Sequence, residues 1–300
     1  MTTVKGDRPS AAKRGYLTCM GEALCRSEKV KAKARNELKG RVLIIAGSDP
    51  SGGAGIQADI KTVTALGGYA ATAITALTVQ NTKGVTAVHP VAPDVIAAQI
   101  EAVMSDIGAD AIKIGMVGDV ETARVIETVL KKYSGVPVVL DPVLIATSGD
   151  ALSKDGVAAF IKEKLARLST VLTPNTDEAA ALTGMEVRSR DAMISAGEAL
   201  VALGAKAALV KGGHMRGDTV EDALVSADGA RIFSNPRIDT TSTHGTGCTL
   251  ASAIATGLAQ GLALQTAVKR AVDYVHKAIA TAPGYGRGHG PLNHSHPCEK

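Results

Sequence analysis

From residue 41 onward, short continuous apolar runs alternate with stretches of helical periodicity. The runs predict buried strands at Arg41–Ala46, Ala73–Val79, Ala111–Ile114, Pro137–Leu140, Thr170–Leu172 and Ala207–Val210. Helices are predicted at Ala54–Leu66, Pro93–Met104, Val120–Lys131, Lys154–Arg167, Thr176–Leu182, Ala192–Leu203, 246–259 and 264–281. Strands without polar alternation, separated by helices, are typical of a parallel sheet covered on both faces. The pattern predicts an α/β fold, a three-layer αβα sandwich with a mostly parallel central sheet.

Two further runs break this alternation. Val220–Val225 and Ala230–Phe233 follow one another with no helical segment between them, which predicts an antiparallel hairpin at one edge of the sheet. A chain of 300 residues is long enough for one domain with a sizeable core. We expect a single domain over 41–294, a disordered basic extension over 1–40 and a tail over 295–300.

Charge is divided unevenly along the chain. The formal net charge is +4, yet residues 1–40 hold ten Lys and Arg against four Asp and Glu, so the remainder is slightly acidic. A basic tail is typical of a solvated extension, and contact with nucleic acid or a membrane is the alternative. Aromatic residues make up 2% of the chain and Trp is absent. Nucleic-acid binding through aromatic stacking is therefore not expected.

The four cysteines are scattered, with Cys248 alone inside the predicted domain. Their spacing matches neither a disulfide framework nor a zinc site. Free cysteines suit a reducing cytoplasm, which is the expected location. No charge-free apolar run approaches the length of a membrane span, and residues 1–40 lack the apolar segment of a secretory signal.

The stretch Thr243–Thr249 (THGTGCT) reads as a glycine-rich turn that opens the helix predicted at 246–259. Glycines let backbone N–H groups converge without obstruction by a Cβ atom. The helix adds its unsatisfied N–H groups and the positive end of its dipole, a combination that binds phosphate. Gly245, Thr246 and Gly247 would supply the donors, with Cys248 in the first turn. A plain helix start with a buried cysteine is the alternative.

Polar residues and glycines follow the predicted strands, at the edge where parallel sheets bind ligands. They are Gly47–Asp49, Gln80–Asn81, Gly115–Met116, Asp141, Thr173–Asn175 and Lys211–Gly213. The chain has no Walker A motif, since Gly-Lys never occurs. Gly53–Ala58 fits G-x-G-x-x-A, but no Asp or Glu lies between Ile60 and Pro93 to hold a ribose, so dinucleotide binding is not favoured.

Several blocks resemble hydroxymethylpyrimidine/phosphomethylpyrimidine kinases of thiamine biosynthesis, in the ribokinase-like superfamily. The first is Ala46–Asp59 (AGSDPSGGAGIQAD). The others, in order, are Ile74–Thr82, Lys113–Met116, Thr173–Ala179, Lys211–His214, Thr243–Thr249 and Gly288–His294. The resemblance implies a ribokinase-like fold over about 41–294, ATP and Mg²⁺ as cofactors, and a homodimer. It also implies phosphorylation of 4-amino-5-hydroxymethyl-2-methylpyrimidine to its monophosphate and then its diphosphate.

Four polar residues are candidates for the nucleotide side. Asn175 and Glu178, spaced N-x-x-E at a helix start, would hold Mg²⁺ directly or through water, and a helix cap is the alternative reading. Asp141 follows a strand and is a second candidate for the metal or for ATP. Lys211, also at a strand end, would neutralise the phosphates of ATP.

Sugar kinases of the superfamily carry an Asp general base where this chain has Cys248. We expect the helix start to lower the pKa of the thiol, so that a thiolate could accept the proton. A thiol can also be neutral, and a neutral group would not repel the second acceptor, which is an anionic monophosphate.

On the substrate side, Gln80 can donate to and accept from an aminopyrimidine edge. Asp59 is predicted to bind the hydroxymethyl group or the ring amine, Gly47 to let the ring approach the backbone, and Met116 to pack on the ring face. The nearby His214 and His244 are read as loop-packing residues. Two other functions remain open: a pyridoxine/pyridoxal kinase of vitamin B6 salvage, and a pyrimidine-binding sensor without turnover.

Overall fold

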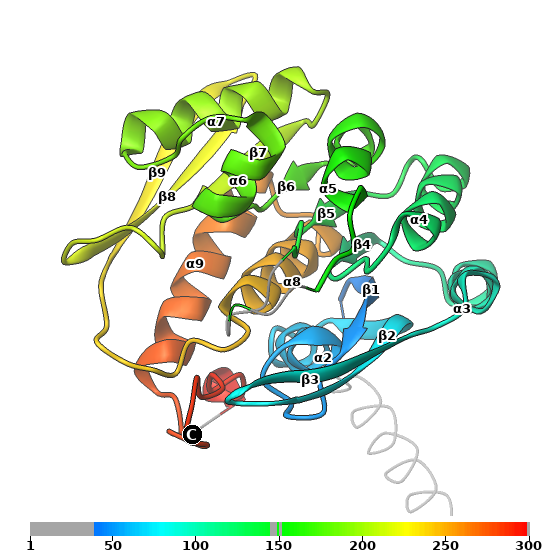
Figure 1. Cartoon of the computed structure of the whole chain (residues 1–300), viewed down its shortest axis with the longest axis horizontal. Helices are drawn as coiled ribbons and strands as arrows, with labels where there is room; N and C mark the ends of the chain where they lie inside the picture. Colours follow the sequence, from blue (N-terminus) through cyan, green and yellow to red (C-terminus); the bar gives the residue numbers. More distant parts are fainter. Residues whose placement is uncertain (1–38, 145–148, 150–151, 299–300) are drawn as a thin grey trace, which may run out of the picture. The chain divides into compact units, whose positions relative to one another are not determined.

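The computed structural model describes residues 39–144, 149 and 152–298. The predicted extension therefore lies outside the described residues, apart from Lys39 and Gly40. One mixed sheet runs through this part of the chain in the order β3-β2-β1-β4-β5-β6-β7-β8-β9 (Figure 1). The strands are β1 Arg41–Ser48, β2 Tyr69–Asn81, β3 Gly84–Pro90, β4 Ala111–Ile114, β5 Val138–Leu140, β6 Val171–Leu172, β7 Ala207–Lys211, β8 Thr219–Ser226 and β9 Gly229–Pro236.

Six strands that follow one another in the sheet are parallel: β2, β1, β4, β5, β6 and β7. Three strands pair in the antiparallel direction, β3 with β2, β8 with β7, and β9 with β8. The predicted mostly parallel sheet and its edge hairpin are confirmed. Strand β3 was not predicted, because Gly84–Pro90 is partly exposed along its length and lacks a continuous apolar run.

Helices cover both faces of the sheet. They are α2 Gly55–Ala65, α3 Pro93–Asp106, α4 Val120–Lys132, α5 Val157–Phe160, α6 Thr176–Thr183, α7 Arg190–Ala202, α8 Thr246–Ala259 and α9 Leu264–Ala280. One apolar cluster joins the sheet to α2, α8 and α9, and a second joins its other face to α3–α7 (Figure 1). Along β1, Leu43 and Ile45 belong to one cluster and Val42 and Ile44 to the other, as the alternation of strand side chains requires.

The segment predicted as one helix over Lys154–Arg167 is divided. A single turn of α-helix, α5, continues as a π-helical turn, Ile161–Leu165, and a 3₁₀ turn, Ala166–Leu168. At the carboxyl end, His296–Cys298 forms a 3₁₀ turn whose His296 ring lies 4.8 Å from the ring of Tyr274. Among the described helices, none has the length and hydropathy needed to cross a membrane.

The strand order reverses at β1, which lies between β2 and β4. The crevice at such a switch point, beyond the carboxyl ends of the strands, is where open α/β sheets bind ligands. Gly47 and Gln80 lie at this edge, with Met116 after β4, Asp141 after β5 and Lys211 at the end of β7. The fold therefore gathers residues that are far apart in the sequence around one crevice.

Candidate active site

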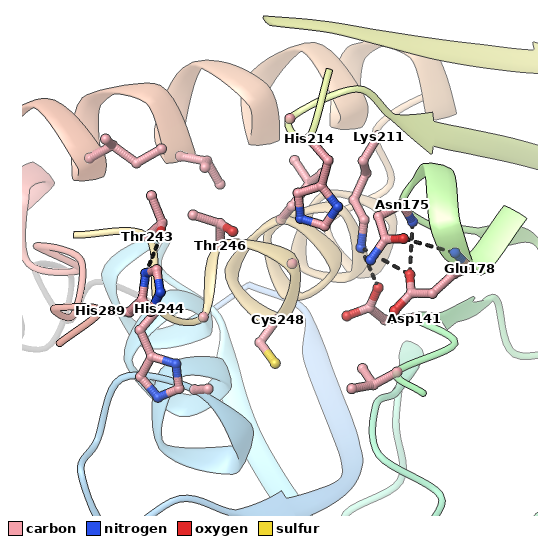
Figure 2. Close-up of a pocket in the computed structure, with 18 of the residues that line it drawn as sticks. Asp141, Asn175, Glu178, Lys211, His214, Thr243, His244, Thr246, Cys248 and His289 are labelled. Atoms are coloured by element: carbon pink, nitrogen blue, oxygen red, sulfur yellow. Dashed lines mark hydrogen bonds and ion pairs between the residues drawn. The ribbon is translucent and has the colours of Figure 1, made fainter. Parts of the chain in front are cut away.

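A cavity of about 770 Å³ opens at the carboxyl edge of the sheet. This volume suits a ligand of nucleotide size or two smaller ligands side by side. All but one of the predicted site residues line it: Gly47, Gln80, Met116, Asp141, Asn175, Glu178, Lys211, Gly245, Thr246, Gly247 and Cys248. Figure 2 shows Thr246 and Cys248 at the centre of the view, between Asp141, Lys211 and Glu178 on one side and Thr243 and His289 on the other.

The anion turn, Gly245–Cys248, depends on glycine at its first position. Gly245 has φ +82°, and a Cβ atom there would lie 1.9 Å from the carbonyl oxygen of Gly53. Helix α8 begins at Thr246, directly after this residue. Its first N–H groups lack acceptors within the helix, and the positive end of its dipole is directed at the cavity. The turn therefore has the glycine and the helix start that were predicted, and its binding of a phosphoryl group stays a prediction.

A cluster of three charged side chains lies beside the anion turn (Figure 2). The Lys211 ammonium is 2.8 Å from Asp141 Oδ1 and 3.9 Å from Glu178 Oε2. It is also 3.1 Å from the place that a Cβ atom on Gly247 would take. Burial opposes the charge on Lys211, yet Asp141 and Glu178 hold its pKa above the ordinary value. Lys211 is therefore a cation fixed next to the anion turn.

Glu178 lies deeper in the same cluster, with 8% of its side chain exposed. Burial raises the pKa of its carboxyl group to about 7, and the attraction of Lys211 offsets only part of this effect. A carboxylate that lacks charge compensation favours a further cation nearby. Among the described residues, no group of three or more His, Cys, Asp and Glu side chains is arranged to hold a metal by itself. A metal here would need phosphate and water oxygens as additional ligands.

Asn175 caps helix α6. Its Oδ1 atom accepts hydrogen bonds from the N–H groups of Asp177 and Glu178, both at 2.9 Å, and Glu178 Oε2 accepts from Asn175 N at 2.8 Å. This is the capping box that was the alternative reading of the N-x-x-E spacing. Both lone pairs of the amide oxygen are engaged, which favours contact with Mg²⁺ through water over direct contact, and metal binding by Asn175 stays a prediction. Asn175 also lines the cavity.

Cys248 lies in the first turn of α8 and is partly exposed to the cavity. Burial raises the pKa of its thiol to about 11, and the Lys113 ammonium offsets this only in part. This direction is opposite to the predicted lowering by the helix start, because burial disfavours the charged thiolate. A pKa of about 11 favours the neutral thiol at pH 7.

Asp59 does not line the cavity, which corrects its prediction as a substrate ligand. Its side chain is fully buried, and its carboxylate binds Lys113 Nζ at 2.8 Å and Ser252 Oγ at 2.6 Å. Lys113 is also fully buried, on strand β4. The Asp59 carboxylate holds the pKa of Lys113 above its ordinary value despite burial. No role was predicted for Lys113, because a lysine inside an apolar run gives no sign of its partner.

The remaining predicted substrate residues are close together at the carboxyl ends of β1, β2 and β4. Gln80 Oε1 accepts a hydrogen bond from Thr78 Oγ1 at 3.2 Å, and both residues line the cavity. A Cβ atom on Gly47 would lie 3.0 Å from Met116 Sδ. Glycine at position 47 therefore leaves room for the Met116 side chain, which is 7% exposed.

Asp49 and His244 form a buried pair that joins two loops of the site. His244 Nε2 lies 2.8 Å from Asp49 Oδ2, which also accepts from Ser51 Oγ and Ala54 N at 2.8 Å. His244 therefore packs between the loops, as predicted, whereas the role of Asp49 was missed. His214 lies at the cavity with a largely exposed side chain, 3.6 Å from Asp177.

Comparison with known proteins shows the family of this chain. A family model described as phosphomethylpyrimidine kinase matches residues 49–293. The hydroxymethylpyrimidine/phosphomethylpyrimidine kinase of Rhizobium meliloti is 48% identical over 257 residues, which are 85% of this chain and 96% of that protein. The thiamine biosynthesis bifunctional protein ThiED of Geobacter sulfurreducens is also 48% identical over 257 residues. The chain covers 52% of that longer protein, about half its length.

Two solved structures have the same fold. The phosphomethylpyrimidine kinase of Clostridium difficile superposes with a TM-score of 0.72 and is 42% identical, covering 80% of this chain and 100% of that one. An ADP complex of Bacillus subtilis pyridoxal kinase gives a TM-score of 0.79 at 35% identity, covering 86% of this chain and 98% of that one.

Proposed function

Since the chain belongs to the phosphomethylpyrimidine kinase family, we propose that its cavity transfers the γ-phosphoryl group of ATP to two acceptors in turn. The activity is that of a hydroxymethylpyrimidine/phosphomethylpyrimidine kinase of thiamine biosynthesis. The first acceptor is the alcohol of 4-amino-5-hydroxymethyl-2-methylpyrimidine, and the second is the resulting monophosphate. One observation carries this assignment to the cavity: the anion turn, the charged cluster of Lys211, Asp141 and Glu178, and Gln80 all line the same cavity.

On the nucleotide side, the anion turn receives the γ-phosphoryl group. Lys211 stabilises the negative charge on the phosphates, and the amide N–H groups of Asn175, which also lines the cavity, can donate to them. Val272, Val275 and Ile279 also line the cavity and give the purine ring an apolar surface on which to pack. Phosphoryl transfer needs mainly positioning and charge stabilisation, which these groups supply.

Mg²⁺ fits the donor set of the charged cluster. Glu178 and Asp141 offer carboxylate oxygens, the ligands that Mg²⁺ prefers, and the ion keeps several waters and substrate phosphate oxygens as its other ligands. Bound Mg²⁺ would neutralise charge on the phosphates of ATP. Glu178 would lose its proton on binding the ion, because its raised pKa reflects burial without enough positive charge nearby.

The pH dependence of catalysis tests the role assigned to Glu178. The carboxyl group is neutral below its pKa of about 7 and charged above it, so kcat/KM for ATP is expected to rise as pH increases through about 7. Glu178→Gln should lower kcat/KM and flatten this rise. A steady-state pH profile measures it, and an unchanged inflection in the Gln variant would rule out Glu178 as its source.

On the acceptor side, Gln80 pairs with the aminopyrimidine edge, while Met116 and Gly47 border the ring. The neutral Cys248 thiol faces the acceptor without repelling an anion. A proton acceptor is not required for the second transfer, because the attacking phosphate oxygen is already charged.

Cys248→Asp is expected to weaken the second transfer at least about tenfold more than the first, since a carboxylate next to the anion turn repels a phosphate acceptor and not an alcohol. Separate kcat/KM measurements with each acceptor provide the comparison. Equal losses for both acceptors would mean that the charge at position 248 does not distinguish them.

We also propose that the protein acts in the cytoplasm as a homodimer. Leu77 and Val79 are each 50% exposed on the outward face of β2, whereas Thr78 and Gln80 on the other face line the cavity. An exposed apolar pair on a sheet suits a protein contact. Sedimentation of the parental protein should give twice the chain mass, and Leu77→Ser with Val79→Thr should shift it toward the monomer. A monomeric parental protein would contradict the proposal.

The acceptor is identified by incubating the protein with Mg²⁺ and ATP and resolving the products by mass. The acceptors are hydroxymethylpyrimidine, its monophosphate and pyridoxal. We expect mono- and diphosphorylated pyrimidine. Pyridoxal kinase is the second candidate because a pyridoxal kinase shares the fold at 35% identity. Turnover of pyridoxal alone would replace the proposal with vitamin B6 salvage.

A further inference from the structure

The second transfer makes a demand on the site that the first does not. Its acceptor is a phosphate monoester, whose oxygen must attack the γ-phosphorus while the anion turn already holds that group. The acceptor phosphate therefore needs hydrogen-bond donors of its own. Since one bridging oxygen will join it to the γ-phosphorus, these donors must lie next to the anion turn, on its pyrimidine side. This reasoning rests on the proposed function.

The segment Gly288–Gly290, here called the backbone strap, is hydrogen-bonded both to the end of the strand that carries Gln80 and to the loop next to the anion turn. His289 N donates to Thr82 O at 2.8 Å, just beyond the strand that carries Gln80. Gly290 N donates to Thr241 O at 3.1 Å, and Gly290 O accepts from His244 N at 3.1 Å, next to the anion turn. The main chain thus holds position 289 between the pyrimidine side and the turn.

Two side chains at this place have donor groups for an anion. Thr243 Oγ1 lies 3.3 Å from His289 Nδ1, and both residues line the cavity. Figure 2 shows them on the opposite side of the anion turn from Lys211 and Asp141. When the Thr243 hydroxyl donates to Nδ1, the imidazole Nε2–H is left to donate to a phosphate oxygen, and in the other tautomer the hydroxyl is left to do so. By contrast, the nearby His244 ring is engaged with Asp49.

We propose that Thr243 and His289 form a second anion subsite, which binds the phosphate of the monophosphate acceptor. In the second transfer, a non-bridging oxygen of that phosphate forms the new bond to the γ-phosphorus. The bond from the γ-phosphorus to the β,γ-bridging oxygen breaks, and ADP leaves with its electron pair. The subsite orients the attacking phosphate and takes no part in the first transfer, whose acceptor is uncharged.

The test uses the full chain and two readouts. Calorimetric titration without ATP gives the Kd of the monophosphate and of hydroxymethylpyrimidine, and steady-state assays give KM for each. His289→Ala is expected to raise Kd and KM for the monophosphate at least about tenfold, the loss of one hydrogen bond to a charged group. The values for hydroxymethylpyrimidine should stay unchanged. Thr243→Val should act in the same direction, and His289→Asn, which keeps an N–H donor, should recover part of the loss.

His89→Ala is the matched control, because His89 is exposed on β3 and does not line the cavity. Equal weakening of both acceptors, or unchanged monophosphate binding in His289→Ala, would overturn the subsite. If the parental protein phosphorylates neither acceptor, the proposed function fails. The titration with monophosphate alone then still decides whether the subsite exists.

Discussion

Replacing Lys211 by Met is expected to lower turnover of both acceptors by about 10²- to 10³-fold, the usual effect of losing one group that stabilises transition-state charge. Lys211 lies beside Gly247 of the anion turn and 2.8 Å from Asp141. Without its ammonium group, Asp141 and Glu178 would face the phosphates uncompensated. Steady-state kinetics at saturating ATP measure the loss.

Lys206→Met provides a matched control, because Lys206 is exposed and lies just before the opposite end of the same strand. It should leave turnover unchanged. A Lys211→Met variant that keeps most of the parental turnover while its Tm is also unchanged would show that catalysis does not depend on Lys211.

Replacing Lys113 by Met is expected to lower the free energy of unfolding by about 3–5 kcal/mol, because it leaves the buried Asp59 carboxylate without its partner. Ser252 alone would then bind this carboxylate in a fully buried setting. Replacing Asp59 by Leu in the same chain removes the uncompensated charge and should recover most of the loss. Urea unfolding followed by circular dichroism measures both variants.

The exposed pair of Lys132 and Glu101 serves as the comparison for this prediction. Their side chains are 57% and 48% exposed, and solvent screens their attraction. Lys132→Met should change stability little. A Lys113→Met variant as stable as Lys132→Met would show that the buried Lys113 contributes no more to stability than an exposed lysine.

The sheet was largely predictable because its central strands are buried on both faces. β1 and β4 are continuous apolar runs, and glycines or polar residues mark where they end. β3 escaped prediction because an edge strand with partly exposed residues has no such pattern. The divided helix after Gly156 was also unforeseen, since its apolar periodicity is that of one continuous helix.

The candidate site was predictable where backbone geometry or strand ends determine it. Gly245 and Lys211 are such positions, and both line the cavity. Asp59 was misplaced because sequence spacing does not reveal whether a helix residue faces a cavity or a buried lysine. The direction of the Cys248 pKa shift was misjudged for a related reason: the helix start is visible in the sequence, but the burial that raises the pKa depends on packing.

A time course with hydroxymethylpyrimidine and excess Mg²⁺ and ATP, resolved by mass, tests most directly whether one anion turn serves both transfers. In the parental protein we expect the monophosphate to accumulate and then decline as the diphosphate forms. In Lys211→Met, the rates of both steps should fall together. Absence of the diphosphate, or its formation by Lys211→Met at the parental rate, would contradict the use of a single site for both transfers.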